Sequence, residues 1–252
     1  MQIEQSVPRG AAPRYLASDL GLCEGVTMSS AELTTASSQR IRQKRSQKTY
    51  DALIATAFKL LEQREFDEIS IADLAQKAGY SVGAFYARFK SKDELFDAML
   101  EQHIDNRRQT RAQQFATASD SALIRVVLED TIQYYWARRR FWRAALIRSI
   151  RDEDFWAPIR KLSHELGDSL VARISERARR PLTEEEETNV RFAVQVTLGT
   201  VNNAIINRPG PIFLGHALFV ENLIRAFRVV SGYDELIAGG ARAKGARRQK
   251  GR

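Results

Sequence analysis

The chain has 252 residues, of which 44% are hydrophobic and 28% are charged, and its formal net charge is +8. This length allows one sizeable hydrophobic core or two small ones, and no apolar run approaches the roughly 18 residues of a membrane-spanning helix. The only cysteine, Cys23, excludes an intramolecular disulfide framework and a structural zinc site built on cysteines. We expect no membrane association and a reducing, cytoplasmic location, since the N-terminus also lacks the pattern of a secretion signal.

The positive charge is concentrated in two segments of the chain. Residues 38–50 contain five basic residues and no acid, and residues 241–252 contain six basic residues and no acid. Without these two segments the formal charge of the remainder is −3. Charge confined in this way indicates a surface for phosphate groups rather than a generally basic protein.

Residues 1–39 are rich in Ser, Ala, Thr and Gly without a sustained apolar period, which predicts a disordered N-terminal extension. The basic segment that follows leads into a helix that is predicted to end near Arg64. We expect this basic arm to contact the minor groove or the phosphates of DNA, and a solvated run of charges is the alternative. Its candidate DNA-binding residues are Arg40, Arg42, Lys44, Arg45 and Lys48.

Residues 70–89 read as two short helices separated by a tight turn. Ser70 predicts the N-cap of the first helix, and Asp73 is in position to complete a capping box. Gly79 predicts the end of this helix because glycine readily adopts the left-handed conformation, and Ser81 predicts the next N-cap. Such a pair is typical of the motif that places its second helix in the major groove of DNA. The apolar faces consist of Ile71, Leu74, Ala75 and Ala78 in the first helix and Phe85 and Phe89 in the second.

The second of these helices carries the side chains that we expect to read DNA. Small apolar side chains on its outer face, such as Val82 and Ala84, can contact thymine methyl groups. Neighbouring polar side chains, and Tyr80 in the turn, can reach phosphates or base edges, and the alternative for each is a surface side chain without a partner. The candidate residues are Ser70, Tyr80, Ser81, Val82, Ala84, Tyr86, Arg88 and Lys92.

Ser91-Lys92-Asp93-Glu94 is a further capping box, which opens the next helix. Together with Ser70-Ile71-Ala72, Ala78-Gly79 and Ser81-x-Gly83-x-Phe85-Tyr86-x-x-Phe89, it resembles the N-terminal domain of the TetR family of bacterial transcriptional repressors. The resemblance covers roughly residues 50–96 and implies that Tyr86 and Lys92 contact phosphates. It also implies a two-fold dimer through the last two helices and a ligand pocket in the helical domain. Tyr80 and Val82 differ from the residues that are commoner at these positions in the family. This difference bears on which operator sequence is bound and not on the fold.

A long helix is predicted from Asp93 to about Thr117, and no later stretch alternates like a strand. Helical spacing continues near residues 121–138, 141–151, 156–179, 183–206 and 211–231, with a capping box at Thr183 and Glu186. The sequence therefore predicts an all-α protein with a helix-turn-helix DNA-binding domain and a helical ligand-binding and dimerisation domain. The predicted boundaries are 1–39 for the extension, 40–96 for the DNA-binding domain with its basic arm, 97–232 for the second domain and 233–252 for a basic, disordered tail.

The last two predicted helices are apolar around most of their circumference, so each must be covered on more than one side. In a domain of this size an identical pair from a second chain can provide that cover and form a four-helix homodimer interface. A purely intramolecular core is the alternative. The candidate interface residues are Leu198, Val201, Ile205, Leu214, Leu218 and Leu223.

Aromatic residues between positions 134 and 156, with polar side chains on the helix near 183–206, have the composition of a ligand pocket in a helical bundle. The family resemblance implies a pocket for a small-molecule effector, whereas ordinary core packing is the alternative for each residue. Arg148 can pair with an acidic group. The candidate ligand-binding residues are Tyr135, Trp136, Trp142, Arg148, Trp156, Gln195, Thr200 and Asn203.

His103, His164 and His216 are scattered, and the chain has no HExxH, no GxSxG and no phosphate-binding glycine loop. We therefore expect no enzyme, no cofactor and no metal. The expected function is that of a nucleoid-associated regulator that binds double-stranded DNA as a homodimer. It is expected to be a repressor released from a pseudo-palindromic operator by a small apolar or amphipathic ligand. The alternative is a regulator controlled by a protein partner, or an architectural DNA-binding protein without a small-molecule sensor.

Overall fold

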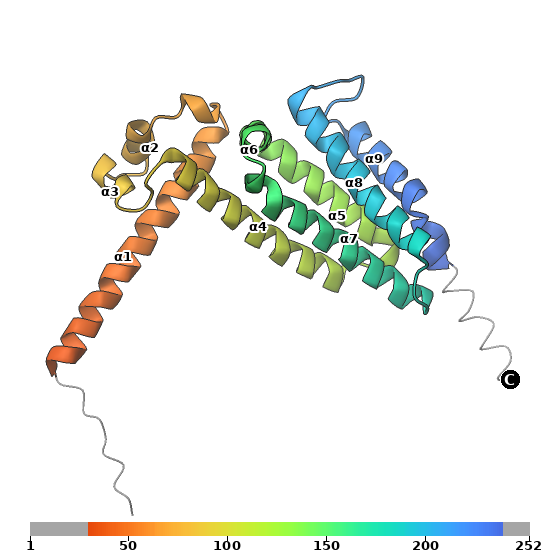
Figure 1. Ribbon diagram of the computed structural model, residues 1–252, viewed down its shortest axis with the longest axis horizontal. Helices are drawn as coiled ribbons and strands as arrows, with labels where there is room; N and C mark the ends of the chain where they lie inside the picture. Colours follow the sequence, from red (N-terminus) through yellow and green to blue (C-terminus); the bar gives the residue numbers. More distant parts are fainter. Residues whose placement is uncertain (1–29, 239–252) are drawn as a thin grey trace, which may run out of the picture. The chain divides into compact units, whose positions relative to one another are not determined.

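The computed structural model describes the backbone of residues 30–238 and the side chains of residues 43–238. The chain divides into two units after Arg45, inside the first helix. No strand occurs in the described range, so the prediction of an all-α fold is confirmed. The helices are α1 (Ser30–Leu61), η1 (Phe66–Glu68), α2 (Ile71–Lys77), α3 (Val82–Tyr86), α4 (Lys92–Thr117), α5 (Asp120–Ala137), α6 (Arg139–Arg151), η2 (Asp154–Trp156), α7 (Ala157–Ala178), α8 (Glu184–Ile206) and α9 (Ala217–Ser231) (Figure 1).

The two ends of the described range correct the predicted disordered segments. Of the predicted N-terminal extension, residues 1–29 lie outside the described residues, whereas residues 30–39 are the first turns of α1. Ala31, Glu32 and Leu33 favour helix there, because such residues lose little side-chain freedom in a helix. Cys23 and the basic residues 241–252 lie outside the described residues.

The predicted C-terminal tail begins as ordered structure. Residues 233–238 are helical, and Tyr233 is buried with its hydroxyl donating to the Asp120 carbonyl at 2.6 Å. Leu236 and Ile237 pack against the core formed by α5, α7, α8 and α9. An aromatic ring and two aliphatic side chains thus bury enough apolar surface to order the segment, despite its low apolar content overall.

The helix-turn-helix forms as its local signals predict. The hydroxyl of Ser70 accepts the Asp73 N–H and that of Ser81 accepts the Ala84 N–H, each at 3.1 Å. Gly79 ends α2 with a φ of +79°. The predicted capping box at Ser70 is incomplete, because the Asp73 carboxylate turns away from Ser70 and pairs with Arg64.

Helix α3 is shorter than predicted, but its apolar side is buried as expected. Phe85 and Phe89 are almost completely buried, with ring centroids 5.5 Å apart, and Phe89 also lies 5.0 Å from the Tyr50 ring of α1. Phe89 lies beyond the end of α3, so the helical period correctly predicts its burial but not the end of the helix.

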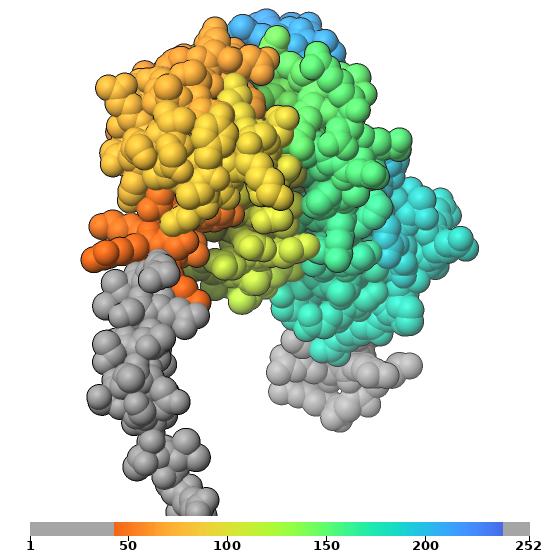
Figure 2. Space-filling model, turned by 60° about the vertical axis from the view of Figure 1, so that its left-hand side comes forward, coloured from red at the N-terminus to blue at the C-terminus, as the bar shows by residue number. Residues whose placement is uncertain are grey.

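Helix α4 carries the hydrophobic core from the helix-turn-helix into the following helices. The centroid of the Phe96 ring lies 4.7 Å from that of Phe66 and 4.9 Å from that of Phe141, and the ring also packs against Phe155. In Figure 2 the orange and yellow residues of α1–α4 abut the green residues of the later helices. The domain boundary predicted after residue 96 therefore falls inside a continuous helix and a continuous core.

Helices α8 and α9 lie side by side, and both pack on the helices before them (Figure 1). The capping box of α8 forms as predicted, with Thr183 and Glu186 each accepting the other's backbone N–H. Helix α9 begins at Ala217 instead of near residue 211, because Gly215 has a φ of +98°, which a right-handed helix does not allow. No described helix is long and apolar enough to cross a membrane.

Candidate functional site

One side of α3 forms a small exposed surface next to the turn. Val82 is 40% exposed and Tyr86 is 54% exposed, whereas Phe85 is completely buried on the opposite side. Gly83 and Ala87 are exposed beside them, so the surface holds one phenol among small or apolar groups. Such a surface can approach base edges closely, contact thymine methyl groups and donate a hydrogen bond from Tyr86 to a phosphate.

The turn and the two N-caps border this surface. Tyr80 is half-buried, its backbone N–H donates to the Ala75 carbonyl at 2.9 Å, and its hydroxyl has no hydrogen-bond partner among the described residues. Ser70 and Ser81 are exposed at the N-termini of α2 and α3. Backbone N–H groups at helix N-termini attract phosphates, so both positions are compatible with their predicted role.

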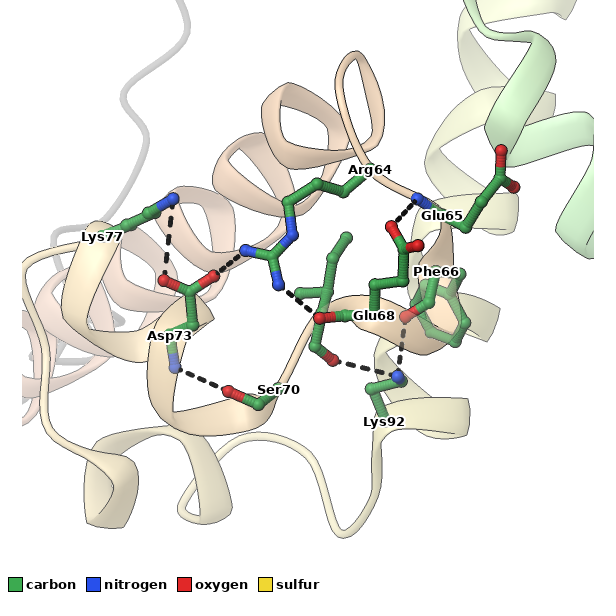
Figure 3. A network of polar contacts seen from close by, with 9 residues as sticks. Arg64, Glu65, Phe66, Glu68, Ser70, Asp73, Lys77 and Lys92 are labelled. Carbon is green, nitrogen blue, oxygen red and sulfur yellow. Dashed lines mark hydrogen bonds and ion pairs between the residues drawn. The ribbon is translucent and has the colours of Figure 1, made fainter.

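The ammonium of Lys92 is engaged within the chain, and its predicted phosphate contact stays a prediction. Its Nζ donates to the carbonyls of Phe66 and Ile69 at 2.7 and 3.0 Å and lies 4.5 Å from the centroid of the Phe66 ring (Figure 3). Burial lowers the pKa of Lys92. Because the ammonium is held by the segment that precedes α2, Lys92 helps to position that helix, and the side chain as a whole is half-buried.

An ion-pair network that the sequence did not reveal holds α2 from the other side. Arg64 pairs with Asp73 and donates to the Glu68 carbonyl, and Lys77 lies 3.6 Å from the Asp73 carboxylate (Figure 3). The spacing of four between Asp73 and Lys77 is a visible signal, but the nine residues to Arg64 follow no helical repeat. These contacts fix α2, and through the turn they fix the exposed side of α3.

Two further candidates are less exposed than predicted. The Arg88 guanidinium donates to the carbonyls of Ser46 and Ala87 at 3.2 and 2.8 Å, so it ties the end of α3 to α1. Ala84 is half-buried. Only one narrow side of such a short helix faces solvent, and Ala84 lies outside it.

The basic arm lies on α1. The side chains of Lys44, Arg45 and Lys48 are exposed. Arg40 and Arg42 are on the same helix, but their side chains lie outside the described ones. The role of the arm in binding DNA therefore stays a prediction.

A buried polar cluster surrounds His103 in α4. Its Nδ1 lies 2.8 Å from the Tyr134 hydroxyl, and Arg107 is buried beside it in an ion pair with Asp130. Burial, reinforced by the charge of Arg107, lowers the pKa of His103 to about 3, so this imidazole is neutral at physiological pH. His164 and His216 are exposed elsewhere, and no described group of three or more metal-ligating side chains could hold a metal ion.

A cavity of about 690 Å³ lies between α7 and α8. The predicted ligand-binding residues Tyr135, Trp156 and Gln195 line it. Asn202, one of the polar side chains on the helix predicted near 183–206, also lines it, and its buried Oδ1 has no hydrogen-bond partner among the described residues. Its charged residues are Arg160, Asp168 and Arg191, and His164 also lines it.

The remaining predicted ligand-binding residues lie elsewhere. Trp142 is completely buried and stacks on Tyr135 at a centroid distance of 4.2 Å, so it supports the wall of the cavity from behind. Arg148 forms an ion pair with Asp97 at 2.8 Å. Thr200 and Asn203 lie on the exposed side of α8, and Trp136 lines a different cleft. Aromatic composition alone did not distinguish residues that face a cavity from residues that fill the core.

The predicted dimer interface also needs correction. Val201, Ile205, Leu214 and Leu223 are buried within the single chain because α8 and α9 pack on the earlier helices, and Leu198 is half-buried in the wall of the cavity between α7 and α8. Leu218 alone of the six predicted residues is exposed, at 55%. Apolar side chains that are open to a partner on these two helices are Phe192, Leu218 and Val229.

Comparison with known proteins agrees with the geometry of the helix-turn-helix. A sequence model described as bacterial regulatory proteins of the tetR family matches residues 53–99. The HTH-type transcriptional regulator EthR of Mycobacterium tuberculosis is 32% identical over 112 residues, which are 42% of this chain and 52% of that protein. The uncharacterised HTH-type regulator YwcC of Bacillus subtilis is 42% identical over 53 residues, or 21% of this chain and 24% of that protein.

The chain thus matches about half or less of the length of these curated relatives. Solved structures extend the likeness to the whole fold. A tetR-family regulator from Streptomyces coelicolor aligns with a TM-score of 0.56 and 21% identity over 78% of this chain and 88% of that one. A transcriptional regulator from Cytophaga hutchinsonii aligns with a TM-score of 0.57 and 13% identity over 75% of this chain and 96% of that one.

Proposed function

The chain belongs to the TetR family of bacterial regulatory proteins, and from this premise we propose that it is a homodimeric repressor whose operator is released when a small molecule binds. DNA binding is assigned to the helices up to about residue 96, and ligand binding and dimerisation to the helices that follow. The protein would act in the cytoplasm, at the nucleoid.

The exposed side of α3 is the observation that carries the proposal. Val82 and Tyr86 are open to solvent while Phe85, between them in sequence, is buried. Helix α3 contains no acidic residue, and the Asp73 carboxylate of α2 pairs with Arg64 and Lys77. A surface with a phenol, small apolar groups and no free acid suits the major groove, where an unpaired carboxylate would repel phosphates.

A homodimer would supply a second helix-turn-helix for DNA binding. The exposed apolar side chains on α8 and α9 could be covered by the same two helices of a second chain, which would place two copies of α3 on half-sites of a pseudo-palindrome. Leu218→Glu should then yield a folded monomer, since the side chain faces solvent in the single chain.

Leu223→Glu is the matched contrast, because Leu223 is buried in the chain's own core and a charge there should prevent folding. Size-exclusion chromatography with light scattering, together with circular dichroism, separates the two results. A folded dimer of Leu218→Glu would contradict this interface.

The cavity between α7 and α8 is the proposed effector site. Its aromatic wall and the unpartnered Oδ1 of Asn202 suit a mostly apolar ligand with at least one hydrogen-bond donor. Such a ligand would release DNA only to the extent that it binds the non-DNA-binding conformation more tightly. Asn202→Leu should weaken effector binding without changing DNA affinity in the absence of effector.

Selection of bound duplexes from a random DNA pool at physiological salt tests the proposed function as a whole. Recovery of a palindrome would support a dimeric, sequence-specific reader and would supply the operator for effector screening. Recovery of duplexes without a common sequence would contradict sequence-specific repression and favour an architectural DNA-binding protein.

A further inference from the structure

A second cleft, of about 480 Å³, is lined by residues from the start of α6, the end of α8 and the loop that leads to α9. We name it the arginine cleft, because Arg139, Arg140, Arg143 and Arg208 all line it and Glu65 is its only acidic residue. Its apolar wall includes Trp136, Ile212 and Phe213. It is separate from the cavity between α7 and α8, with which it shares no lining residue.

The arginines stand where helix electrostatics disfavours them. The first turn of α6 has no acidic residue and contains Arg139 and Arg140, with Arg143 one turn further. The N-terminal end of a helix carries the positive end of the helix dipole, so cations there are repelled and anions are attracted. Residues that break a local stability rule are often retained for a ligand.

The guanidinium groups of the cleft are unequally neutralised. Arg140 lies 3.4 Å from the Glu65 carboxylate and also donates to the Glu62 carbonyl. Arg143 and Arg208, by contrast, form no ion pair or hydrogen bond within the described part of the chain. Two cations in one concave site whose single carboxylate, Glu65, is already paired with Arg140 are a ready binding site for an anion.

The backbone at Arg208 supports a role for its side chain. Arg208 has a φ of +49° immediately after the end of α8, a position that glycine or asparagine adopts at less cost. Its guanidinium carbon lies 6.0 Å from the centroid of the Phe213 ring, at the apolar wall. An arginine at this strained position places a charge at the rim of the cleft.

The apolar wall is held firmly by its neighbours. The Arg139 guanidinium lies 4.6 Å from the centroid of the Trp136 ring. The backbone of Gly215 also packs against the Trp136 ring, so closely that a Cβ at position 215 would lie 2.7 Å from a ring carbon. A flat ring fixed beside unpaired guanidinium groups suits a ligand with an acidic group and an apolar body.

We propose that the arginine cleft binds a small organic anion, with its acidic group at Arg143 and Arg208 and its apolar part against Trp136 and Phe213. The site needs no DNA, so its test is independent of the proposed function. Glu65 opposes the bound anion, because its carboxylate adds negative charge and holds Arg140 away from the ligand.

Calorimetric titration of the full chain with 1-naphthoate tests the proposal, with 1-naphthyl phosphate as a second acidic probe and 1-naphthalenemethanol as the neutral analogue. One saturable site per chain is expected for at least one acid, and the neutral alcohol should bind about tenfold more weakly or worse. Whichever of the two acidic probes binds more tightly shows whether the cleft prefers a carboxylate or a phosphate. Absence of saturable binding by both acids, or equal binding of the alcohol, would overturn the proposal.

Four variants locate the site. Arg143→Gln and Arg208→Gln should each weaken binding by about tenfold, whereas Glu65→Gln should strengthen it. Arg151→Gln makes the same charge change at the far end of α6 and should leave the affinity within about twofold. If Arg143→Gln and Arg208→Gln both leave the affinity unchanged, the ligand binds elsewhere, for example in the cavity between α7 and α8. If Arg151→Gln weakens binding as much as they do, the effect comes from the net charge of the protein. Either result overturns the proposal. Melting temperatures confirm that each variant is folded.

Discussion

The helix-turn-helix and the α8–α9 pair are both built from helices, but different forces determine where their residues lie. In the first, Ser70, Ser81 and Gly79 determine where each helix starts and stops, and short-range hydrogen bonds in the structure reproduce those signals. In the second, burial depends on which side of each helix meets the earlier helices. Leu223 is buried and Leu218 is exposed although both are leucines on the same helix.

The difference teaches that local signals identify an element, while only tertiary packing decides which of its side chains are free to act. Lys92 lies in the helix-turn-helix region, which was the better predicted of the two, and yet tertiary contacts determine where its side chain lies. Its ammonium is held by two carbonyls from a segment more than 20 residues earlier. The following four predictions test how far the two regions differ.

Loss of the Phe85 ring should have the largest effect. Phe85→Ala removes a completely buried ring from the small core of the helix-turn-helix and should lower the free energy of unfolding by about 4 kcal/mol. Ile150→Ala is the control, since Ile150 is 83% exposed and its loss should cost less than about 0.5 kcal/mol. Chemical denaturation measures both; similar losses would contradict the assignment of Phe85 to a core.

Removal of the Lys92 ammonium should destabilise the segment before α2. Lys92→Met keeps most of the aliphatic chain but loses two charge-assisted hydrogen bonds, which should cost about 2 kcal/mol of stability. Lys90→Met is the control, because Lys90 is exposed and its ammonium has no partner among the described residues. If Lys92→Met leaves stability intact and weakens DNA binding, then Lys92 is a phosphate contact after all.

His103 predicts a pH dependence for the helices beyond α3. Its pKa is about 3 in the folded chain and 6.5 for an ordinary histidine, so between these values the unfolded chain binds the additional proton and stability falls as the pH falls. From pH 7 to pH 5 the loss should be about 2 kcal/mol. His103→Gln should remove this part of the slope. An unchanged slope in His103→Gln would show that His103 is protonated without cost.

Loss of the α3 cap should have the smallest effect on stability. Ser81→Ala leaves the Ala84 N–H without its 3.1 Å acceptor and should cost about 1 kcal/mol. Ser81→Asp, which can accept the same hydrogen bond, should retain stability but weaken DNA binding through repulsion from phosphates. Thermal unfolding and a fluorescence binding assay measure the two quantities. Loss of stability in both variants would contradict a capping role.

Much of the fold could be predicted from the helical period of apolar residues and from the residues that cap helices. The caps at Ser70, Ser81, Ser91 and Thr183 mark helix starts correctly, because each depends on a hydrogen bond to a residue three positions later. The end of α3 and the start of α9 were less well predicted. The ends of helices depend on turns and tertiary contacts that the helical period does not encode.

The site was less predictable than the fold. The exposure of Val82 and Tyr86 follows from the helical period, since Phe85 must face the core. The engagement of Arg88 with Ser46 does not, because 42 residues separate the two. Nor does the arginine cleft, which brings together Glu65, the start of α6 and Arg208 from distant parts of the chain.

The central claim is that the exposed side of α3 reads DNA, and Tyr86 tests it most directly. Binding to the selected palindrome and to an unrelated duplex should be measured for the wild type, Tyr86→Ala and the control Tyr50→Phe, whose ring packs on Phe89 inside the helix-turn-helix. Tyr86→Ala should weaken binding by about tenfold or more with only a small change in melting temperature, since the side chain is 54% exposed and its one ring contact is edge-on to Phe85 at a centroid distance of 5.5 Å. Tyr50→Phe should bind as the wild type does. Full affinity in Tyr86→Ala would contradict α3 as the reading surface.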